Sequence, residues 1–197
     1  MTSIPSTPRI PCSDADSPAR KADLRKQLLT ARRAIDGAAR AAWDRAIGDQ
    51  VLAWWKAEQP AALGVYWPLR DEPDLHPAYA ELARLGARLL LPVVVLKDAA
   101  LEFAEWLPGE AMVKDQMGVA VPADLRLQAA YPPALLVPCL GFNADGYRLG
   151  YGGGFYDRTL ARHTPRPQTL GIAYQCLQVP FGADVHDVAL DRIITEV

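Results

Sequence analysis

The chain has 197 residues, half of them apolar, with a formal net charge of −2 and an isoelectric point near 5.9. This length predicts one domain with a continuous core. The charge balance excludes a general basic surface of the kind that binds nucleic acid or an anionic membrane, so we expect neither as a partner and expect any bound anion to be held locally.

The N-terminus and the cysteines indicate where the protein works. Residues 1–19 contain four prolines among Ser, Thr and Asp, which predicts a disordered leader, and they lack the apolar core of a secretion signal. No apolar run approaches the roughly 18 residues of a membrane span. The three cysteines are far apart and fit no CxxC or zinc spacing, as is typical of a reducing compartment. We therefore expect a cytoplasmic protein, as a monomer, with one domain over residues 20–197.

Two helices are predicted at the start of this domain. In residues 20–35, the amphipathic pattern places Leu24, Leu28 and Ala31 on one stripe, with basic residues elsewhere. A second helix follows before Pro60. The residues expected on its buried face are Trp43, Ile47, Val51, Trp54 and Trp55.

After Pro60 the pattern changes to short apolar runs that alternate with helices. Continuous apolar runs are typical of strands buried on both faces, and this alternation favours a largely parallel sheet. Strands are expected within residues 62–68, 88–96, 101–106, 134–142, 168–174 and 192–196, and helices at 77–87 and from about 153. The predicted fold class is α/β, a three-layer α/β/α domain with a mostly parallel sheet and an N-terminal helical pair.

Four of the five residues 150–154 are glycine, after a predicted buried strand and before a predicted helix. A P-loop is excluded, because Gly146 is followed by Tyr147 and Arg148 where that motif needs Lys and a hydroxyl. A GxGxxG dinucleotide motif is excluded as well, because counting from Gly150 places Phe155 at its last position.

Two interpretations of the glycines remain. They could form only a tight turn, or their N–H groups and the helix N-terminus could face one anion. Arg148 and Arg158 bracket the loop, and Asp145 or Asp157 could hold magnesium or orient a cation. These flanking charges favour a nucleotide phosphate site.

The segment LVPCLGFNADGYRLGYGGGFYDRTLA strongly resembles the signature of the 5-formyltetrahydrofolate cyclo-ligase family, also called 5,10-methenyltetrahydrofolate synthetases. That signature runs from a strand and a Gly-Phe corner to R-x-G-x-G-(G/K)-G-(F/Y)-Y-D, and the resemblance extends from about residue 21 to 197. It implies conversion of 5-formyltetrahydrofolate and ATP to 5,10-methenyltetrahydrofolate, ADP and phosphate, with Mg²⁺ as cofactor and through phosphorylation of the formyl oxygen.

The resemblance also implies roles for individual residues. Lys21 and Arg148 are the catalytic candidates, as cations on the transferred phosphoryl group. The implied nucleotide contacts are Lys21, Arg25, Arg148, Gly150, Gly152, Gly153, Gly154, Phe155, Tyr156 and Asp157. The implied folate contacts are Glu72 on the pterin edge, Met117 where an aromatic residue is common, and Tyr156. Asp145 and Asp157 are the metal candidates.

Other residues receive weaker interpretations. The closing pattern of Asp187, Asp191 and Thr195 fits the family, although a structural role in capping and pairing explains it equally well. The histidines form no triad or metal spacing, and Cys139 is expected in the core. Arg32, Arg33 and Lys97 could form a basic patch for a polyglutamate tail.

Two other hypotheses stand beside an active cyclo-ligase. One is a non-catalytic relative that binds nucleotide or folate. The other is a different ATP-dependent ligase or kinase on the same scaffold, which would hydrolyse ATP without binding folate.

Overall fold

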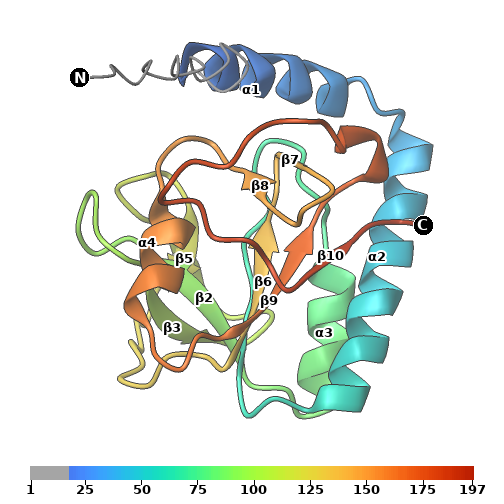
Figure 1. Cartoon of the computed structure of the whole chain (residues 1–197). Helices are drawn as coiled ribbons and strands as arrows, with labels where there is room; N and C mark the ends of the chain where they lie inside the picture. The colour runs from blue at the N-terminus through green and yellow to red at the C-terminus, as the bar shows by residue number, and fades with distance from the viewer. Residues whose placement is uncertain (1–17) are drawn as a thin grey trace, which may run out of the picture.

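A computed structural model describes residues 18–197 (Figure 1). Its centre is a six-stranded sheet with the order β10-β9-β6-β1-β2-β3, in which β3 runs antiparallel to β2 and the other neighbours are parallel. The strands are β1 (Leu63–Gly64), β2 (Leu89–Val93), β3 (Glu102–Trp106), β6 (Ala134–Pro138), β9 (Gln168–Ile172) and β10 (Arg192–Ile194). The predicted α/β class with a mostly parallel sheet is confirmed.

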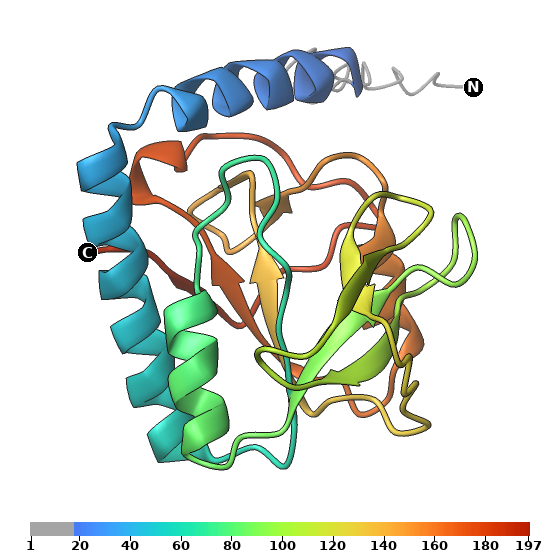
Figure 2. The ribbon, with the colours of Figure 1, turned by 180° about the vertical axis from the view of Figure 1, so that it is seen from behind.

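Helices cover both faces of this sheet. The helices are α1 (Pro18–Arg33), α2 (Gly37–Glu58), α3 (His76–Arg84) and α4 (Phe155–Arg162), and a 3-10 turn, η2, spans Gln175–Leu177. The two views show α2 and α3 together on one side of the sheet, and α4 on the other (Figures 1 and 2). Helix α1 crosses the end of the molecule toward which the parallel strands point. The expected N-terminal helical pair is therefore present, with only its second member packed on the sheet.

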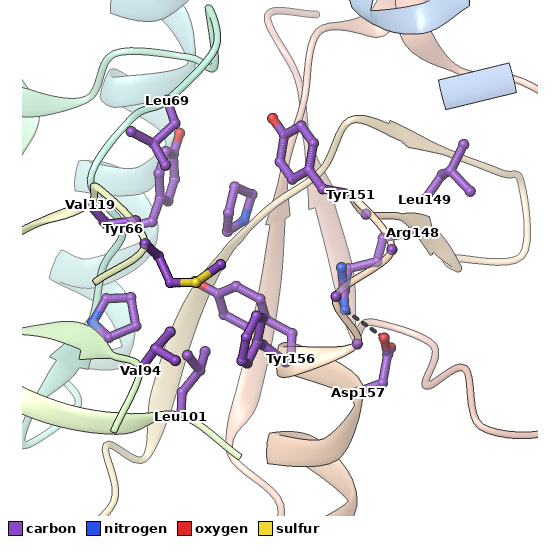
Figure 3. Close-up of a pocket in the computed structure, with 18 of the residues that line it drawn as sticks. Tyr66, Leu69, Val94, Leu101, Val119, Arg148, Leu149, Tyr151, Tyr156 and Asp157 are labelled. Atoms are coloured by element: carbon purple, nitrogen blue, oxygen red, sulfur yellow. Dashed lines mark hydrogen bonds and ion pairs between the residues drawn. The ribbon is translucent and has the colours of Figure 1, made fainter. Parts of the chain in front are cut away.

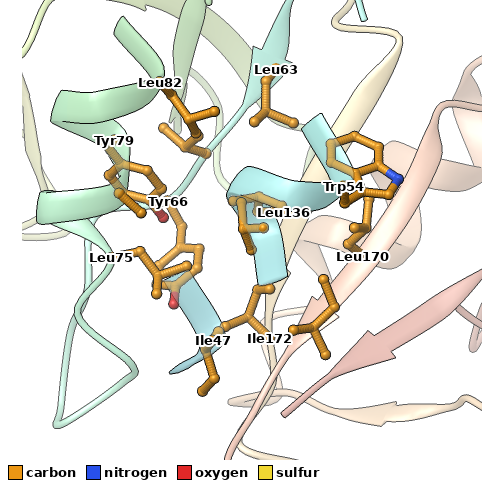
Figure 4. Packing of buried hydrophobic residues seen from close by; sticks show 14 of the residues in the cluster. Ile47, Trp54, Leu63, Tyr66, Leu75, Tyr79, Leu82, Leu136, Leu170 and Ile172 are labelled. Atoms are coloured by element: carbon orange, nitrogen blue, oxygen red, sulfur yellow. The ribbon is translucent and has the colours of Figure 1, made fainter. Parts of the chain in front are cut away.

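The core consists of two main layers, one on each face of the sheet. Leu136 of β6 belongs to the larger cluster, which it shares with α2 and α3 (Figure 4), whereas Leu135 and Val137 belong to the cluster that contains Leu160 of α4. Adjacent residues of a strand point to opposite faces, so a strand buried on both sides must be apolar throughout. This explains the uninterrupted apolar runs in the sequence.

The α2 face is also as predicted, since Ile47, Val51, Trp54 and Trp55 are buried. Trp43 is partly buried and packs against Tyr174, with 5.6 Å between ring centroids.

The stripe predicted on α1 is confirmed for Leu28, which is buried, and for Leu24, which is partly buried against the core, but it is wrong for Ala31, which is exposed. The buried positions of this helix are Lys21, Leu28 and Arg32. These follow a helical spacing, but two of them are cations. Helix α1 covers a polar cleft as well as apolar side chains, so its inner face carries charge.

Several strand limits differ from expectation. The run 62–68 pairs only through Leu63–Gly64 and then turns away toward the cleft, although Val65 N still donates to Leu90 O (2.8 Å). The run 134–142 divides after Pro138, although Cys139 N still donates to Ile172 O at 3.0 Å. It resumes as β7 (Gly141–Phe142), which pairs with β8 (Arg148–Leu149). A second hairpin, β4 (Met112–Lys114) with β5 (Ala120–Pro122), was not predicted.

The N-terminal boundary also differs slightly. Helix α1 already begins at Pro18, two residues before the expected domain start, as suits proline in a first helical turn. The leader expected over the preceding residues, 1–17, lies outside the described part of the chain. Within residues 18–197, no helix is both long enough and apolar enough to cross a bilayer.

Candidate active site

A cleft of about 500 Å³ opens at the carboxyl ends of β1, β2 and β6 (Figure 3). This is the edge at which parallel α/β sheets usually bind ligands. Its walls come from α1, the chain after β1, the β4–β5 hairpin, the glycine loop 150–154 and the segment 184–187. One side is apolar, with Leu69, Val94, Leu101 and Val119, and the other carries the cations Lys21, Arg25 and Arg148.

The glycine loop forms the cationic side together with the N-terminus of α4. Gly152 and Gly154 have φ values of 92° and 62°, in the region that favours glycine. Gly154 is the N-cap of α4 and supplies no side-chain cap, so the first N–H groups of this helix are left for another acceptor. Backbone amides and the helix dipole together favour an anion here.

Lys21 and Arg25 reach this region from α1, one turn apart. Lys21 Nζ lies 2.6 Å from Asp184 Oδ2 and 2.9 Å from Asp187 Oδ2. Burial lowers the pKa of Lys21, but the hydrogen bonds to the two aspartates outweigh it and the pKa is raised. Arg25 Nε donates to Gly150 O at 2.8 Å. The helix therefore brings two permanent positive charges to the glycine loop.

The Arg148 side chain is enclosed by the cleft as fully as that of Lys21. Its side chain is 6% exposed, its Nη2 donates to Asp157 Oδ2 at 2.9 Å (Figure 3), and its guanidinium lies over the ring of Tyr156, 5.3 Å from the centroid. Its Nε is buried and has no hydrogen-bond partner within residues 18–197. A buried donor without a partner is costly, so an acceptor from a ligand would be favourable here.

Glu72 lies on the opposite, largely apolar side of the cleft and is only 5% exposed. Its Oε2 accepts from Leu69 N at 2.8 Å and its Oε1 accepts from the Tyr151 hydroxyl at 2.6 Å. Burial raises the pKa of Glu72, while these two hydrogen bonds and the nearby Arg32 and Arg70 oppose the rise. The site thus presents a partly desolvated carboxylate to a flat cleft.

Met117 lies at the tip of the β4–β5 hairpin, lines the cleft and is 59% exposed. The Asp115 carboxylate fixes this tip, because Oδ1 accepts from Met117 N at 2.8 Å and from Val119 N at 2.9 Å. The thioether is therefore presented at the mouth of the cleft on an ordered turn.

Most candidate residues are brought together by the fold. The cleft is lined by Lys21, Arg25, Glu72, Met117, Arg148, Gly150, Gly152, Gly153, Gly154, Phe155, Tyr156 and Asp157. Asp145 is not among them and lines a separate hollow with Asn143 and Phe181. Arg158 does not line the cleft either; its Nη2 donates to Gly153 O at 2.6 Å and its Nε to Ala99 O at 3.2 Å, which holds the loop against α4.

The basic patch suggested for a polyglutamate tail is not formed. Arg32 is 0% exposed and donates to Arg70 O (2.7 Å) and to the Tyr151 hydroxyl, so it is no surface charge. In the C-terminal pattern, Asp191 has a structural role, accepting from Thr169 N (2.8 Å) and from Arg166. Asp187 differs, because it lines the cleft beside Lys21.

Sequence reasoning missed Asp184 and Tyr151. Asp184 accepts a hydrogen bond from Lys21, which lies 163 positions earlier in the sequence, and no local sequence pattern indicates such a contact. Tyr151 is the one residue with a large side chain in the glycine-rich stretch 150–154, and this feature of the sequence could have identified it as a candidate.

A metal ion would need ligands beyond the protein. The part of the chain that the structure describes holds no group of three or more His, Cys, Asp or Glu residues arranged to bind one. Magnesium usually takes only one or two carboxylates and completes its shell with water and phosphate oxygens. Asp157, which lines the cleft beside Arg148, fits such a partial site, whereas Asp145 lies outside the cleft.

Comparisons with known proteins agree with this geometry. A model described as the 5-formyltetrahydrofolate cyclo-ligase family matches residues 17–196. The 5-formyltetrahydrofolate cyclo-ligase of Mycolicibacterium smegmatis is 33% identical over 190 residues, 91% of this chain and 95% of that protein. The enzyme of Mycoplasma pneumoniae is 28% identical over 174 residues, 88% of this chain and 96% of its own.

Solved structures agree as well. The 5,10-methenyltetrahydrofolate synthetase from Mycoplasma pneumoniae superposes with a TM-score of 0.72 at 29% identity, over 90% of this chain and 99% of that one. The Aquifex aeolicus 5,10-methenyltetrahydrofolate synthetase gives 0.72 at 26% identity, over 89% of each chain.

Proposed function

Because the chain belongs to the 5-formyltetrahydrofolate cyclo-ligase family and converts 5-formyltetrahydrofolate to 5,10-methenyltetrahydrofolate, we propose that it does so by transferring the γ-phosphoryl group of ATP to the formyl oxygen. The observation that carries this proposal is the two-sided cleft, with cations and a glycine loop on one side and the buried Glu72 on the other. Family membership favours this hypothesis over the non-catalytic binder and the unrelated ligase.

The chemistry explains why ATP is needed. The formyl group on N5 is an amide, so its carbon is a poor electrophile and its oxygen a poor leaving group. Phosphorylation makes the carbon iminium-like, N10 attacks it to close the ring and gives up its proton to water, and the C–O bond breaks as the oxygen departs with phosphate. The protein then has to position two substrates and neutralise charge, which is the usual requirement in phosphoryl transfer.

We assign the triphosphate to the cationic side. The N–H groups of the glycine loop and the start of α4, with Lys21, Arg25 and Arg148, would surround its oxygens. Lys21 and Arg148 are each tied to carboxylates in the unliganded protein, so binding of phosphate would replace or share those ion pairs. We assign a catalytic role to these two cations because they would face the transferred group.

We assign the pterin to the Glu72 side. A carboxylate can accept two hydrogen bonds from the donor-rich edge of that ring. Leu69, Val119 and Met117 line the cleft and would cover its faces, and Tyr156, which also lines the cleft, would lie between the two substrates. The amide oxygen is itself the nucleophile, so the first step needs no general base from the protein.

Mg²⁺ fits beside Asp157, where it would neutralise charge on the phosphoryl oxygens. The protein groups that would act with it are the glycine-loop amides and Arg148. We propose a functional monomer, which a measured solution mass near 21.5 kDa would support and one near twice that value would contradict.

The test is the near-ultraviolet absorbance of the purified protein with 5-formyltetrahydrofolate and Mg²⁺, with and without ATP. We expect an ATP-dependent rise from the conjugated methenyl product, with one ADP formed per product. A rise without ATP consumption would overturn the phosphorylation route. ATP hydrolysis with no methenyl product would point to another substrate.

A further inference from the structure

Glu72 is presented by an unusual turn. In residues 69–72 the two central residues, Arg70 and Asp71, have φ values of 50° and 62°, a conformation that glycine or asparagine normally supplies. The turn is closed by Glu72 N, which donates to Leu69 O at 3.0 Å. Two consecutive left-handed residues persist only where the surroundings hold them.

The corner between α1 and α2 supplies that support. Arg32 Nη2, at the end of α1, donates to Arg70 O at 2.7 Å. Arg40 Nη1, on α2, donates to Asp71 Oδ1 at 2.8 Å, and its Nη2 donates to Arg32 O at 3.1 Å. The N-terminal helices thus hold the turn that carries the folate-side carboxylate.

Arg32 also orients Tyr151. Its Nη2 donates to the Tyr151 hydroxyl, and an arginine has no acceptor, so the phenol oxygen must accept this bond. The single hydroxyl proton is then directed to Glu72 Oε1, 2.6 Å away. Burial raises the pKa of Tyr151, which keeps that proton in place. The donors therefore run in one direction, from Arg32 to Tyr151 to Glu72.

We propose that Tyr151, oriented by the buried Arg32, is a positioning residue that fixes the Glu72 carboxylate for recognition of the pterin edge. This inference rests on the proposed role of Glu72. Leu69 N and the Tyr151 hydroxyl each engage one carboxylate oxygen, which sets the plane of the group. A carboxylate offers about four lone-pair sites, so acceptor positions remain for a ligand.

The test compares Tyr151→Phe with the control Tyr147→Phe. Tyr147 lies just before β8 and does not line the cleft. Loss of a hydrogen bond to a charged group typically changes affinity about tenfold or more. We expect Tyr151→Phe to weaken 5-formyltetrahydrofolate binding and raise its KM about tenfold, with kcat and the Kd of ATP nearly unchanged. The control should match the wild type.

The pH dependence of folate binding gives a second readout. The Tyr151 hydroxyl stabilises ionised Glu72, so its removal should shift the acid limb of folate binding to higher pH. A purely structural defect would lower affinity at every pH without moving that limb. The other titratable groups near Glu72 stay the same in the variant: Arg32, Arg70, Tyr66, Tyr79 and Tyr156.

Two further variants separate the possible outcomes. Arg32→Gln should weaken folate binding in the same direction as Tyr151→Phe. If Glu72→Gln weakens folate binding but Tyr151→Phe leaves both the affinity and the acid limb unchanged, the positioning role is refuted. If Glu72→Gln itself changes nothing, the proposed folate site is wrong, and that result is distinct from a failure of Tyr151 alone.

Discussion

The ion pair between Arg148 and Asp157 allows the structural role of a cleft cation to be separated from its chemical role. Replacing Arg148 by Met leaves Asp157, whose side chain is 20% exposed, without its partner at 2.9 Å. Breaking a fully buried pair costs about 3–5 kcal/mol, and this partly hydrated pair should cost about 2–3 kcal/mol. For a chain of this size each kcal/mol lowers Tm by about 2–4 °C, so we expect a fall of about 4–12 °C.

Adding Asp157→Asn to Arg148→Met removes the unpaired charge. The double variant should regain about 1–2 kcal/mol of the loss, since residues in direct contact couple by amounts of this order. Turnover should not return, because the triphosphate still lacks the Arg148 cation and the proposed Mg²⁺ site has lost the Asp157 carboxylate. Methenyl formation and urea unfolding of the wild type, Arg148→Met, Asp157→Asn and the double variant measure both effects. Arg84→Met, which breaks an exposed pair with Glu81, is the control that should change neither.

Two results would refute this reasoning. A double variant as unstable as Arg148→Met would show that the two charges are not coupled. A double variant that recovers turnover along with stability would show that Arg148 serves only to neutralise Asp157, and that the Asp157 carboxylate is not needed to hold Mg²⁺.

Three other variants test the folate side and the sheet. Glu72→Gln should raise the KM for 5-formyltetrahydrofolate about 10–100-fold and leave that for ATP unchanged, because a charge-assisted acceptor is lost; equal effects on both substrates would contradict the assignment. The raised pKa of Glu72 means that the folded protein binds its proton more tightly than the unfolded chain does, so the carboxylate destabilises the fold as pH rises above its usual value of 4.5. Urea unfolding should therefore show the variant gaining stability relative to wild type as pH rises, and a constant difference would argue against this. Met117→Tyr should lower the folate KM a few-fold through stacking, and an unchanged KM would place Met117 away from the ring. Gly64→Ala should cost about 1–3 kcal/mol of unfolding free energy, because a Cβ there would lie 2.3 Å from Leu135 Cδ2 and 2.9 Å from Phe103 Cε1; kcat per folded molecule should remain, and a wild-type urea midpoint would show that the core yields.

The features that follow from local pattern were predictable from sequence. The apolar runs of β2, β6 and β9 and the spacing of Ile47, Val51 and Trp54 reflect burial that each segment imposes on its own residues. The glycine loop could be identified from the sequence because backbone positions with positive φ are usually occupied by glycine.

The remaining features depend on contacts between distant segments. Strand β1 is only two residues long because the chain turns into the cleft after Gly64 while β2 and β6 continue, which its apolar sequence does not reveal. The prediction for the buried face of α1 omitted its cations. A helix that covers a polar cleft buries charged side chains, and hydrophobic periodicity detects only apolar ones. The turn at 69–72 contains no glycine, so nothing in its sequence indicates left-handed backbone.

Helix α1 places three cations in a fixed register along one face. Lys21 contacts the segment 184–187, Arg25 the glycine loop and Arg32 the turn at 69–72. The eleven positions from Lys21 to Arg32 make about three helical turns and roughly 16 Å. The length of this helical segment therefore sets the spacing of the three contacts with separate parts of the site. Deleting one residue between Arg25 and Arg32 would rotate Arg32 by about 100° relative to Arg25 and separate the two contacts. The length of this segment is therefore more constrained than the identity of its exposed residues.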